Sequence, residues 1–197
     1  MPKKKPLEIV SSEVKVCTKC ALSRTRTNAV PGVGKALARI LFIGEAPGQS
    51  EDVKGEPFVG AAGQLLDSLL SEIGLSRKTV FITNIVKCRP PRNRPPSQRE
   101  IAACTAYLDR QIIAIKPELT MTLGNFSSAY IFSKAGLPFT SITRVHGKSC
   151  EAIVLGVHTT LFSTFHPAAG LYSAQYREQL KKDFQTLKSK LASHSAN

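Results

Sequence analysis

Short apolar runs alternate with longer amphipathic segments along most of this chain, and this alternation constrains its fold more than any other feature. Four runs have the length and composition of buried strands, at residues 39–44, 80–86, 118–123 and 159–165. Apolar residues at helical spacing or clear helix signals occupy the segments between and after them, at residues 61–73, 97–116, 125–135 and 175–191. Strands that alternate with helices predict an α/β fold with a mainly parallel sheet and helices on both faces.

Local signals add detail to this outline. Ser97 and Glu100 have the S-x-x-E spacing of a capping box, which predicts a helix start. Residues 142–157 are expected to form a β-hairpin with its turn near His146 and Gly147. The Lys-rich start and the last six residues carry no such signal, so residues 1–13 and 192–197 are expected to be flexible tails of a single domain spanning 1–197.

The charge balance indicates the kind of partner. The chain has 27 Lys and Arg against 14 Asp and Glu, a formal net charge of +13, which favours a polyanion such as nucleic acid. The alternative is a basic protein whose charge serves only solubility. No apolar run is long enough to span a membrane, and no apolar segment follows the basic start as in a secretory signal. We therefore expect an intracellular, cytoplasmic protein without a membrane partner.

The five cysteines suggest a metal or cluster site. Cys17 and Cys20 form a C-x2-C pair in a polar, Lys-rich stretch. Cys88 follows far along the chain between Lys87 and Arg89, and Cys104 comes 16 positions later. Four thiolates can hold a zinc ion or an iron–sulfur cluster. The alternative is four unrelated buried thiols, because free cysteine often behaves as a small apolar residue. Cys150 is the odd one, expected to be structural.

Polar residues gather where the predicted strands end, which is where ligands bind in parallel sheets. The first strand is followed by Gly44-Glu-Ala-Pro-Gly-Gln-Ser-Glu-Asp52, the second contains Asn84, and the fourth is followed by His166-Pro167. The carboxylates of Glu45, Glu51 and Asp52 could position water, or simply shape a loop and the start of a helix. Asn84 is either a satisfied core amide or a ligand reader, and Phe58 either fills the core or stacks on a base. No G-x-G-x-x-G or P-loop pattern occurs, which disfavours nucleotide cofactors.

Taken together, these motifs resemble those of the family 4 uracil-DNA glycosylases, the iron–sulfur members of the uracil-DNA glycosylase superfamily. The resemblance covers about residues 14–185 and is specific in its order of motifs. It rests on Cys17-x2-Cys20, Arg26-Thr-Asn-Ala-Val-Pro-Gly32, Gly44-Glu-Ala-Pro-Gly-x-x-Glu-Asp52, Gly55-x-Pro-Phe-Val-Gly60, Thr83-Asn-x-Val-Lys-Cys-Arg-Pro-Pro91 and His166-Pro-Ala-Ala169.

The resemblance implies a single three-layer αβα domain around a central, mainly parallel four-stranded sheet. It also implies an enzyme that flips uracil out of DNA and hydrolyses its N-glycosidic bond, leaving an abasic site. Its implied cofactor is a [4Fe-4S] cluster held by Cys17, Cys20, Cys88 and Cys104. Its implied site is Glu45 near the attacking water, the Ala46 N–H and Glu51 at the base, Phe58 stacked on it, Asn84 reading its edge and His166 at O2.

The remaining expectations concern DNA. Arg89, Arg92 and Arg94 are expected to contact phosphates, and Leu171 or its neighbour Tyr172 to enter the duplex after His166-Pro-Ala-Ala169. Residues 87–96 contain no His, unlike the related covalent uracil-binding proteins, so we expect turnover. The expected partners are uracil-containing DNA, single- or double-stranded, and replication or repair proteins, with the chain itself a monomer. The alternative function is a non-catalytic iron–sulfur or zinc protein that binds DNA or senses damage.

Overall fold

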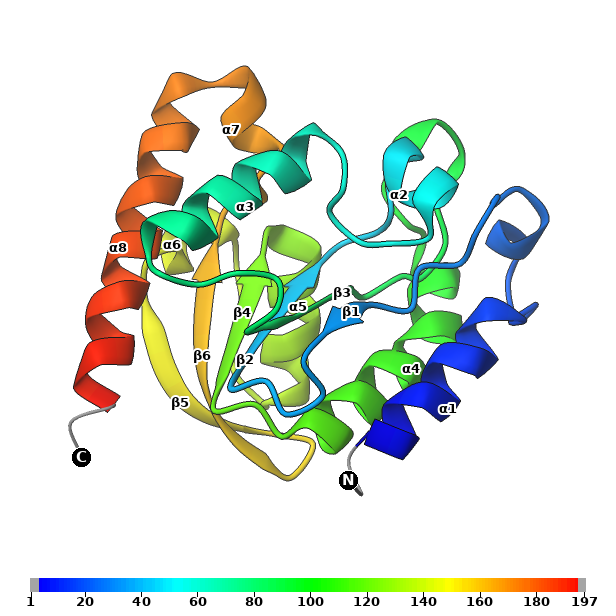
Figure 1. Cartoon of the computed structure of the whole chain (residues 1–197), viewed down its shortest axis with the longest axis horizontal. Helices are drawn as coiled ribbons and strands as arrows, with labels where there is room; N and C mark the ends of the chain where they lie inside the picture. Colours follow the sequence, from blue (N-terminus) through cyan, green and yellow to red (C-terminus); the bar gives the residue numbers. More distant parts are fainter. Residues whose placement is uncertain (1–3, 195–197) are drawn as a thin grey trace.

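A computed structural model describes residues 4–194 as one mixed sheet between two layers of helices. Figure 1 shows α3 and α8 crossing one face of the sheet, α4 and α5 on the other, and α1 alongside α4. The three-layer αβα arrangement predicted for this chain is therefore confirmed.

The sheet has six strands rather than the expected four. They are β1 Val33–Gly34, β2 Ile40–Gly44, β3 Phe81–Asn84, β4 Leu119–Leu123, β5 Ser149–Val154 and β6 Val157–Thr164. Their order across the sheet is β1-β3-β2-β4-β6-β5. The central four, β3, β2, β4 and β6, are parallel and correspond to the four predicted strands, whereas β1 and β5 add antiparallel edges.

The helices fill the connections between strands. The α-helices are α1 Lys4–Lys15, α2 Gln49–Lys54, α3 Ala61–Glu72, α4 Gln98–Ile115, α5 Asn125–Lys134, α6 Ile142–Val145, α7 Ala169–Tyr172 and α8 Ala174–His194. Two short 3-10 turns lie at η1 Ala21–Arg24 and η2 Pro91–Asn93. The predicted capping box begins α4: the Glu100 N–H donates to Ser97 Oγ, and the Ser97 N–H donates to the Glu100 carboxylate.

The core is divided by the sheet because side chains alternate between its two faces. In β2, Leu41 and Ile43 pack toward α1, α4 and α5, while Ile40 and Phe42 pack toward α3 and α8. Both clusters are buried, so every residue of β2 is enclosed by protein. That is why the predicted central strands are nearly continuous apolar runs rather than alternating ones.

The predicted hairpin is real but its position was wrong. Residues 142–145 form the short helix α6, and the hairpin consists of β5 and β6 with its turn at Leu155 and Gly156. Both turn residues have positive φ, 54° and 78°, as a two-residue type I′ turn requires. His146 and Gly147 instead end α6 and lead into β5.

The expectation of a flexible tail over residues 1–13 was also wrong for the described part. Leu7, Val10 and Val14 recur at helical spacing in α1 and are buried against α4. The Lys-rich sequence obscured this apolar stripe. At the other end α8 continues to His194, past the expected fraying point at residue 192, while residues 1–3 and 195–197 lie outside the described chain.

Across residues 4–194, none of the helices has both the length and the apolar character needed to cross a bilayer.

Candidate active site

A cavity of about 430 Å³ opens at the carboxyl edge of the parallel strands. Residues that follow β2, β3 and β6 meet in its wall, together with the loop before α3 and the short helix α7. Of the residues predicted from the sequence, the cavity is lined by Glu45, Ala46, Glu51, Phe58, Asn84, Arg94, His166 and Leu171. Arg89 and Arg92 are not among its lining residues.

Asn84 is the last residue of β3, and its side chain is enclosed in the cavity wall. The residue is 2% exposed, and its Oδ1 has no hydrogen-bond partner within residues 4–194. Leaving a buried amide oxygen unpaired is costly, so such a group in a cavity wall indicates recognition of a ligand. Gly44, opposite it on β2, makes this packing possible because a Cβ there would collide with Asn84 Oδ1 and the Phe58 ring.

Phe58 is held in a backbone conformation that non-glycine residues seldom adopt. Its φ is 55°, and its ring is buried and stacked against the His166 ring with centroids 5.6 Å apart. Arg77 stabilises this conformation by donating to the carbonyl oxygens of Pro57 and Phe58. A Cβ at Gly63 would strike the Phe58 carbonyl, so a glycine is needed beneath it. Strain of this kind persists where the surroundings fix it, commonly at functional sites.

His166 follows β6 and is half-buried in the cavity wall. Burial lowers the pKa of the imidazole to about 4, although the charge of Glu51 acts in the opposite direction. The Ala168 N–H donates to His166 Nδ1 over 3.2 Å, so Nδ1 is the acceptor and the ring proton lies on Nε2. The ring therefore presents a neutral Nε2–H donor at neutral pH.

Two carboxylates that follow β2, Glu45 in the loop and Glu51 in α2, differ in what they contact. Glu51 accepts hydrogen bonds from the N–H groups of Gly48, Val59 and Gly60 at 2.7 to 3.1 Å, which fixes the loop before α3 against α2. Glu45 lines the cavity, and burial raises the pKa of its carboxyl group. Glu51 is thus a rigid part of the wall, whereas Glu45 is suited to exchange a proton.

The arginines beside the cavity have different partners. Arg94 forms a bidentate pair with Glu100 at 2.7 and 2.8 Å, and this pairing lowers the pKa of Glu100 to about 2. Arg89 donates to Asn93 Oδ1 at 2.7 Å. Arg92 is exposed and lies in the turn η2 with a positive φ of 56°. Arg92 can therefore contact a polyanion without breaking an ion pair, as Arg94 would have to, or a side-chain hydrogen bond, as Arg89 would have to.

Leu171 and Tyr172 lie at the mouth of the cavity on α7. Leu171 is partly buried, whereas Tyr172 is 90% exposed, an unusual degree for a large aromatic side chain. An aromatic ring presented to solvent beside a cavity suits contact with a large ligand.

The four cysteines singled out in the sequence line one small cavity between α1, the Cys88 segment and α4. Arg26 Nη1 donates to Cys88 Sγ at 2.9 Å, and the Lys87 N–H donates to Cys104 Sγ at 3.2 Å. Among the described residues, no three His, Cys, Asp or Glu side chains are close enough to hold a single metal ion. The fifth cysteine, Cys150, lies exposed on β5.

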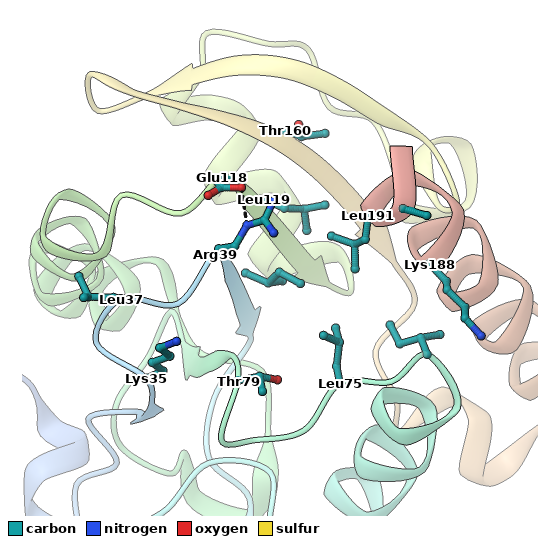
Figure 2. A pocket seen from close by; sticks show the side chains of 13 residues that line it. Lys35, Leu37, Arg39, Leu75, Thr79, Glu118, Leu119, Thr160, Lys188 and Leu191 are labelled. Atoms are coloured by element: carbon teal, nitrogen blue, oxygen red, sulfur yellow. Dashed lines mark hydrogen bonds and ion pairs between the residues drawn. The ribbon is translucent and has the colours of Figure 1, made fainter. Parts of the chain in front are cut away.

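A second cavity, of about 460 Å³, lies at the opposite edge of the sheet, where β2 and β4 begin. Figure 2 shows its apolar wall and the ion pair between Arg39 and Glu118, whose atoms are 2.7 Å apart. It contains neither a histidine nor an unpaired buried amide, so the chemistry is concentrated at the carboxyl edge.

Two residues that shape the site escaped the sequence interpretation. Arg77 holds the Phe58 backbone from 19 residues away, and Lys87 is a buried lysine bonded to the carbonyl of Asn84. The lysine could have been noticed, since it stands in an apolar run directly before Cys88. No local signal marks Arg77.

Comparisons with known proteins agree with this geometry. Residues 31–190 match the family model described as "Uracil DNA glycosylase superfamily". The chain is 53% identical to the type-4 uracil-DNA glycosylase of Sulfurisphaera tokodaii, over 92% of this chain and 83% of that protein. It is 50% identical to the type-4 enzyme of Saccharolobus solfataricus, over 95% and 87%, and 44% identical to that of Thermotoga maritima, over 93% of each.

Proposed function

Since the chain belongs to the uracil-DNA glycosylase superfamily, we propose that it removes uracil from DNA by hydrolysing the bond between the base and C1′ of deoxyribose. The observation that carries the site assignment is the buried, unpaired Oδ1 of Asn84 in the wall of the carboxyl-edge cavity. Because a base inside a duplex is out of reach of such a cavity, the uracil must be extruded from the stack to enter it.

Recognition follows from the complementary edges of uracil and an amide. Uracil offers N3–H as a donor and O4 as an acceptor, so Asn84 Oδ1 accepts from N3–H while its amide NH2 donates to O4. Cytosine reverses this pattern and would leave buried groups unpaired, a mismatch that such sites reject by up to about 10⁴-fold or more. Phe58 stacks on the base, and the Ala46 N–H meets its edge. Glu51, fixed by three backbone donors, crowds C5, where thymine has a methyl group.

The chemistry uses two groups of the carboxyl-edge cavity, Glu45 and His166, whose pKa values burial has shifted. As the N1–C1′ bond breaks, its electron pair leaves with uracil, and the Nε2–H of neutral His166 donates to O2, where negative charge develops. Water attacks C1′ of the electron-poor sugar, and Glu45 orients this water and accepts its proton. The departing uracil anion then takes up a proton and the protonated Glu45 releases one, so the products are uracil and an abasic site, with no covalent intermediate.

The cysteine cavity fits an iron–sulfur cluster in its donor set. Cys17, Cys20, Cys88 and Cys104 would be the ligands of a [4Fe-4S] cluster, and Arg26 and the Lys87 N–H already donate to two of the sulfurs, as is common around such clusters. The cluster would tie α1 and the Cys17–Cys20 segment to α4. Analysis of iron and acid-labile sulfide distinguishes it from zinc: about four of each per chain supports it, and stoichiometric zinc refutes it.

An oligonucleotide assay tests the enzyme directly. We expect a single-stranded or duplex oligonucleotide with one uracil to become alkali-labile at that position, and a thymine oligonucleotide to stay intact. Asn84→Asp or His166→Ala should slow the reaction by about 10²-fold or more while the protein stays folded.

A folded, iron-loaded preparation that binds DNA but releases no uracil would contradict the proposal. That outcome would favour the non-catalytic, damage-sensing alternative. As a DNA repair enzyme the protein acts inside the cell, and we propose that it works as a monomer whose partners include replication or repair proteins.

A further inference from the structure

Lys87 is the least expected buried group in the molecule. It is 1% exposed, and its ammonium donates three hydrogen bonds of 2.6 to 2.7 Å, to Thr83 Oγ1, the Asn84 carbonyl and Gln111 Oε1. All three acceptors are neutral oxygens. Burying an ammonium is costly unless its donors are satisfied in a fixed geometry, so the arrangement of these acceptors is closely defined.

These bonds connect the end of β3 to two other parts of the fold. Gln111 belongs to α4, and its Nε2 donates to the Pro31 carbonyl at 2.7 Å. Thr83 Oγ1 lies 3.1 Å from the same carbonyl. The last two residues of β3 are therefore held by a network that extends through α4 to the segment before β1.

Lys87 also contacts the cysteine cavity. Its own N–H donates to Cys104 Sγ at 3.2 Å, and the next residue is Cys88. The side chain of Lys87 is thus hydrogen-bonded to the Asn84 carbonyl, and its backbone N–H to the Cys104 sulfur. These two hydrogen bonds connect the carboxyl-edge cavity to the cysteine cavity.

We propose that Lys87 is a positioning residue for uracil excision. Its ammonium fixes the main chain of Asn84, aims the buried amide at the base, and couples the order of the cysteine site to the uracil site. This inference rests on the proposed role of Asn84 in reading uracil. A displacement near 1 Å at such a group lowers rates by about 10²-fold, which sets the scale of the effect.

A double-mutant cycle tests the inference. Lys87→Met removes the ammonium at similar length. We expect its single-turnover rate on a uracil oligonucleotide to fall by about 10²-fold, with weaker inhibition by free uracil. DNA affinity and iron per chain should stay within about twofold, because neither depends on the aim of Asn84. In a protein that already carries Asn84→Ala, adding Lys87→Met should lower the rate by less than about a further threefold. The effects of residues that act through one another are not additive.

Lys35→Met is the matched control, because Lys35 is exposed at the opposite edge of the sheet (Figure 2) and the substitution is the same. It should keep the wild-type rate. Thr83→Val, which removes one acceptor of the ammonium, should lower the rate by a smaller factor and provides the test if Lys87→Met does not fold.

Three results would overturn the inference. One is a Lys87→Met protein with wild-type rate and uracil inhibition, or a fully active Thr83→Val protein if Lys87→Met is unfolded. Another is a double mutant whose rate loss equals the product of the two single losses, which would show that Lys87→Met and Asn84→Ala act independently. The third is an unimpaired Asn84→Ala protein, which would refute the proposed role of Asn84 as well. An impaired Asn84→Ala beside an unimpaired Lys87→Met would refute only the role of Lys87.

Discussion

Burial favours the uncharged form of both groups that the proposed reaction uses. It raises the pKa of the Glu45 carboxyl and lowers that of the His166 imidazole to about 4. The two shifts affect the protonation of these groups at different pH. His166 remains a neutral donor across the neutral range, whereas Glu45 becomes protonated at a higher pH than an exposed glutamate does.

The pH profile should therefore reflect Glu45. We expect kcat/KM to fall as the pH drops through the raised pKa of Glu45, because only the carboxylate can accept a proton from water. Glu45→Gln should be slow and lose this limb, while remaining able to bind uracil-containing DNA. Rates measured from about pH 5 to 6, above the pKa of about 4 of His166 and below the pKa of about 7 to which burial lowers Lys87, provide the check. A Glu45→Gln profile that still follows the wild-type limb would assign the titration to another group.

The site residues at strand ends could be predicted because a polar side chain that follows a buried strand lies where ligands bind in a parallel sheet. Glu45, Asn84 and His166 each interrupt or follow an apolar run, so their convergence on one edge follows from a parallel sheet. Arg77 could not be found in this way, because it contacts the Phe58 carbonyl 19 residues away and a one-dimensional pattern does not encode such a contact. Lys87 is marked by its place in an apolar run, but its contact with Gln111 on α4 is not.

At the scale of elements, helix α4 begins beside the active site and its first turn is stabilised by two kinds of contact. The capping box joins Ser97 to Glu100, and Glu100 also pairs with Arg94 at the cavity. Glutamine can replace glutamate in the capping box but not in the ion pair, so the two contributions can be separated.

We expect Glu100→Ala to lower the free energy of unfolding by about 1 kcal/mol or more, because it removes the acceptor of the Ser97 N–H and of Arg94, and Glu100→Gln to cost less. Pairing depresses the pKa of Glu100 from 4.5 to about 2. The advantage of wild type over Glu100→Gln should thus be complete above pH 4.5 and disappear as the pH falls toward 2. Urea unfolding at several pH values measures this. If wild type remains more stable than Glu100→Gln by the same amount at pH 2, the ion pair between Arg94 and Glu100 is not the source of the difference.

Helices and strands with strong periodic patterns were predicted well, and the errors have physical causes. Residues 1–13 were predicted to be a flexible tail, although residues 4–15 form a helix, because lysines flank a stripe of only three buried apolar residues. The hairpin turn was misplaced because His146-Gly147 has typical turn composition, whereas Leu155 adopts positive φ at a position that asparagine would favour. In both places tertiary contacts outweighed local preference.

For the whole molecule, the net charge of +13 makes the salt dependence of DNA binding a quantitative test. Each phosphate contact steepens the fall of log K with log salt by about 0.7 on single strands. Arg92→Ala should therefore reduce the slope by about that amount. Arg39→Ala, with the same charge change at the edge away from the cavity, should leave the slope unchanged. Equal slopes for Arg92→Ala and wild type would remove Arg92 from the DNA interface.

The shared cavity of the four cysteines also has a consequence for the order in which the protein is made. Cys17 and Cys20 leave the ribosome early, but their partner thiols at residues 88 and 104 follow only after β2 and β3 have been synthesised. The first pair must therefore wait, reduced and unclosed, through the translation of more than 80 residues. With the cluster proposed above as the occupant of this cavity, iron shortage or an oxidant during this interval would damage nascent chains more than finished ones.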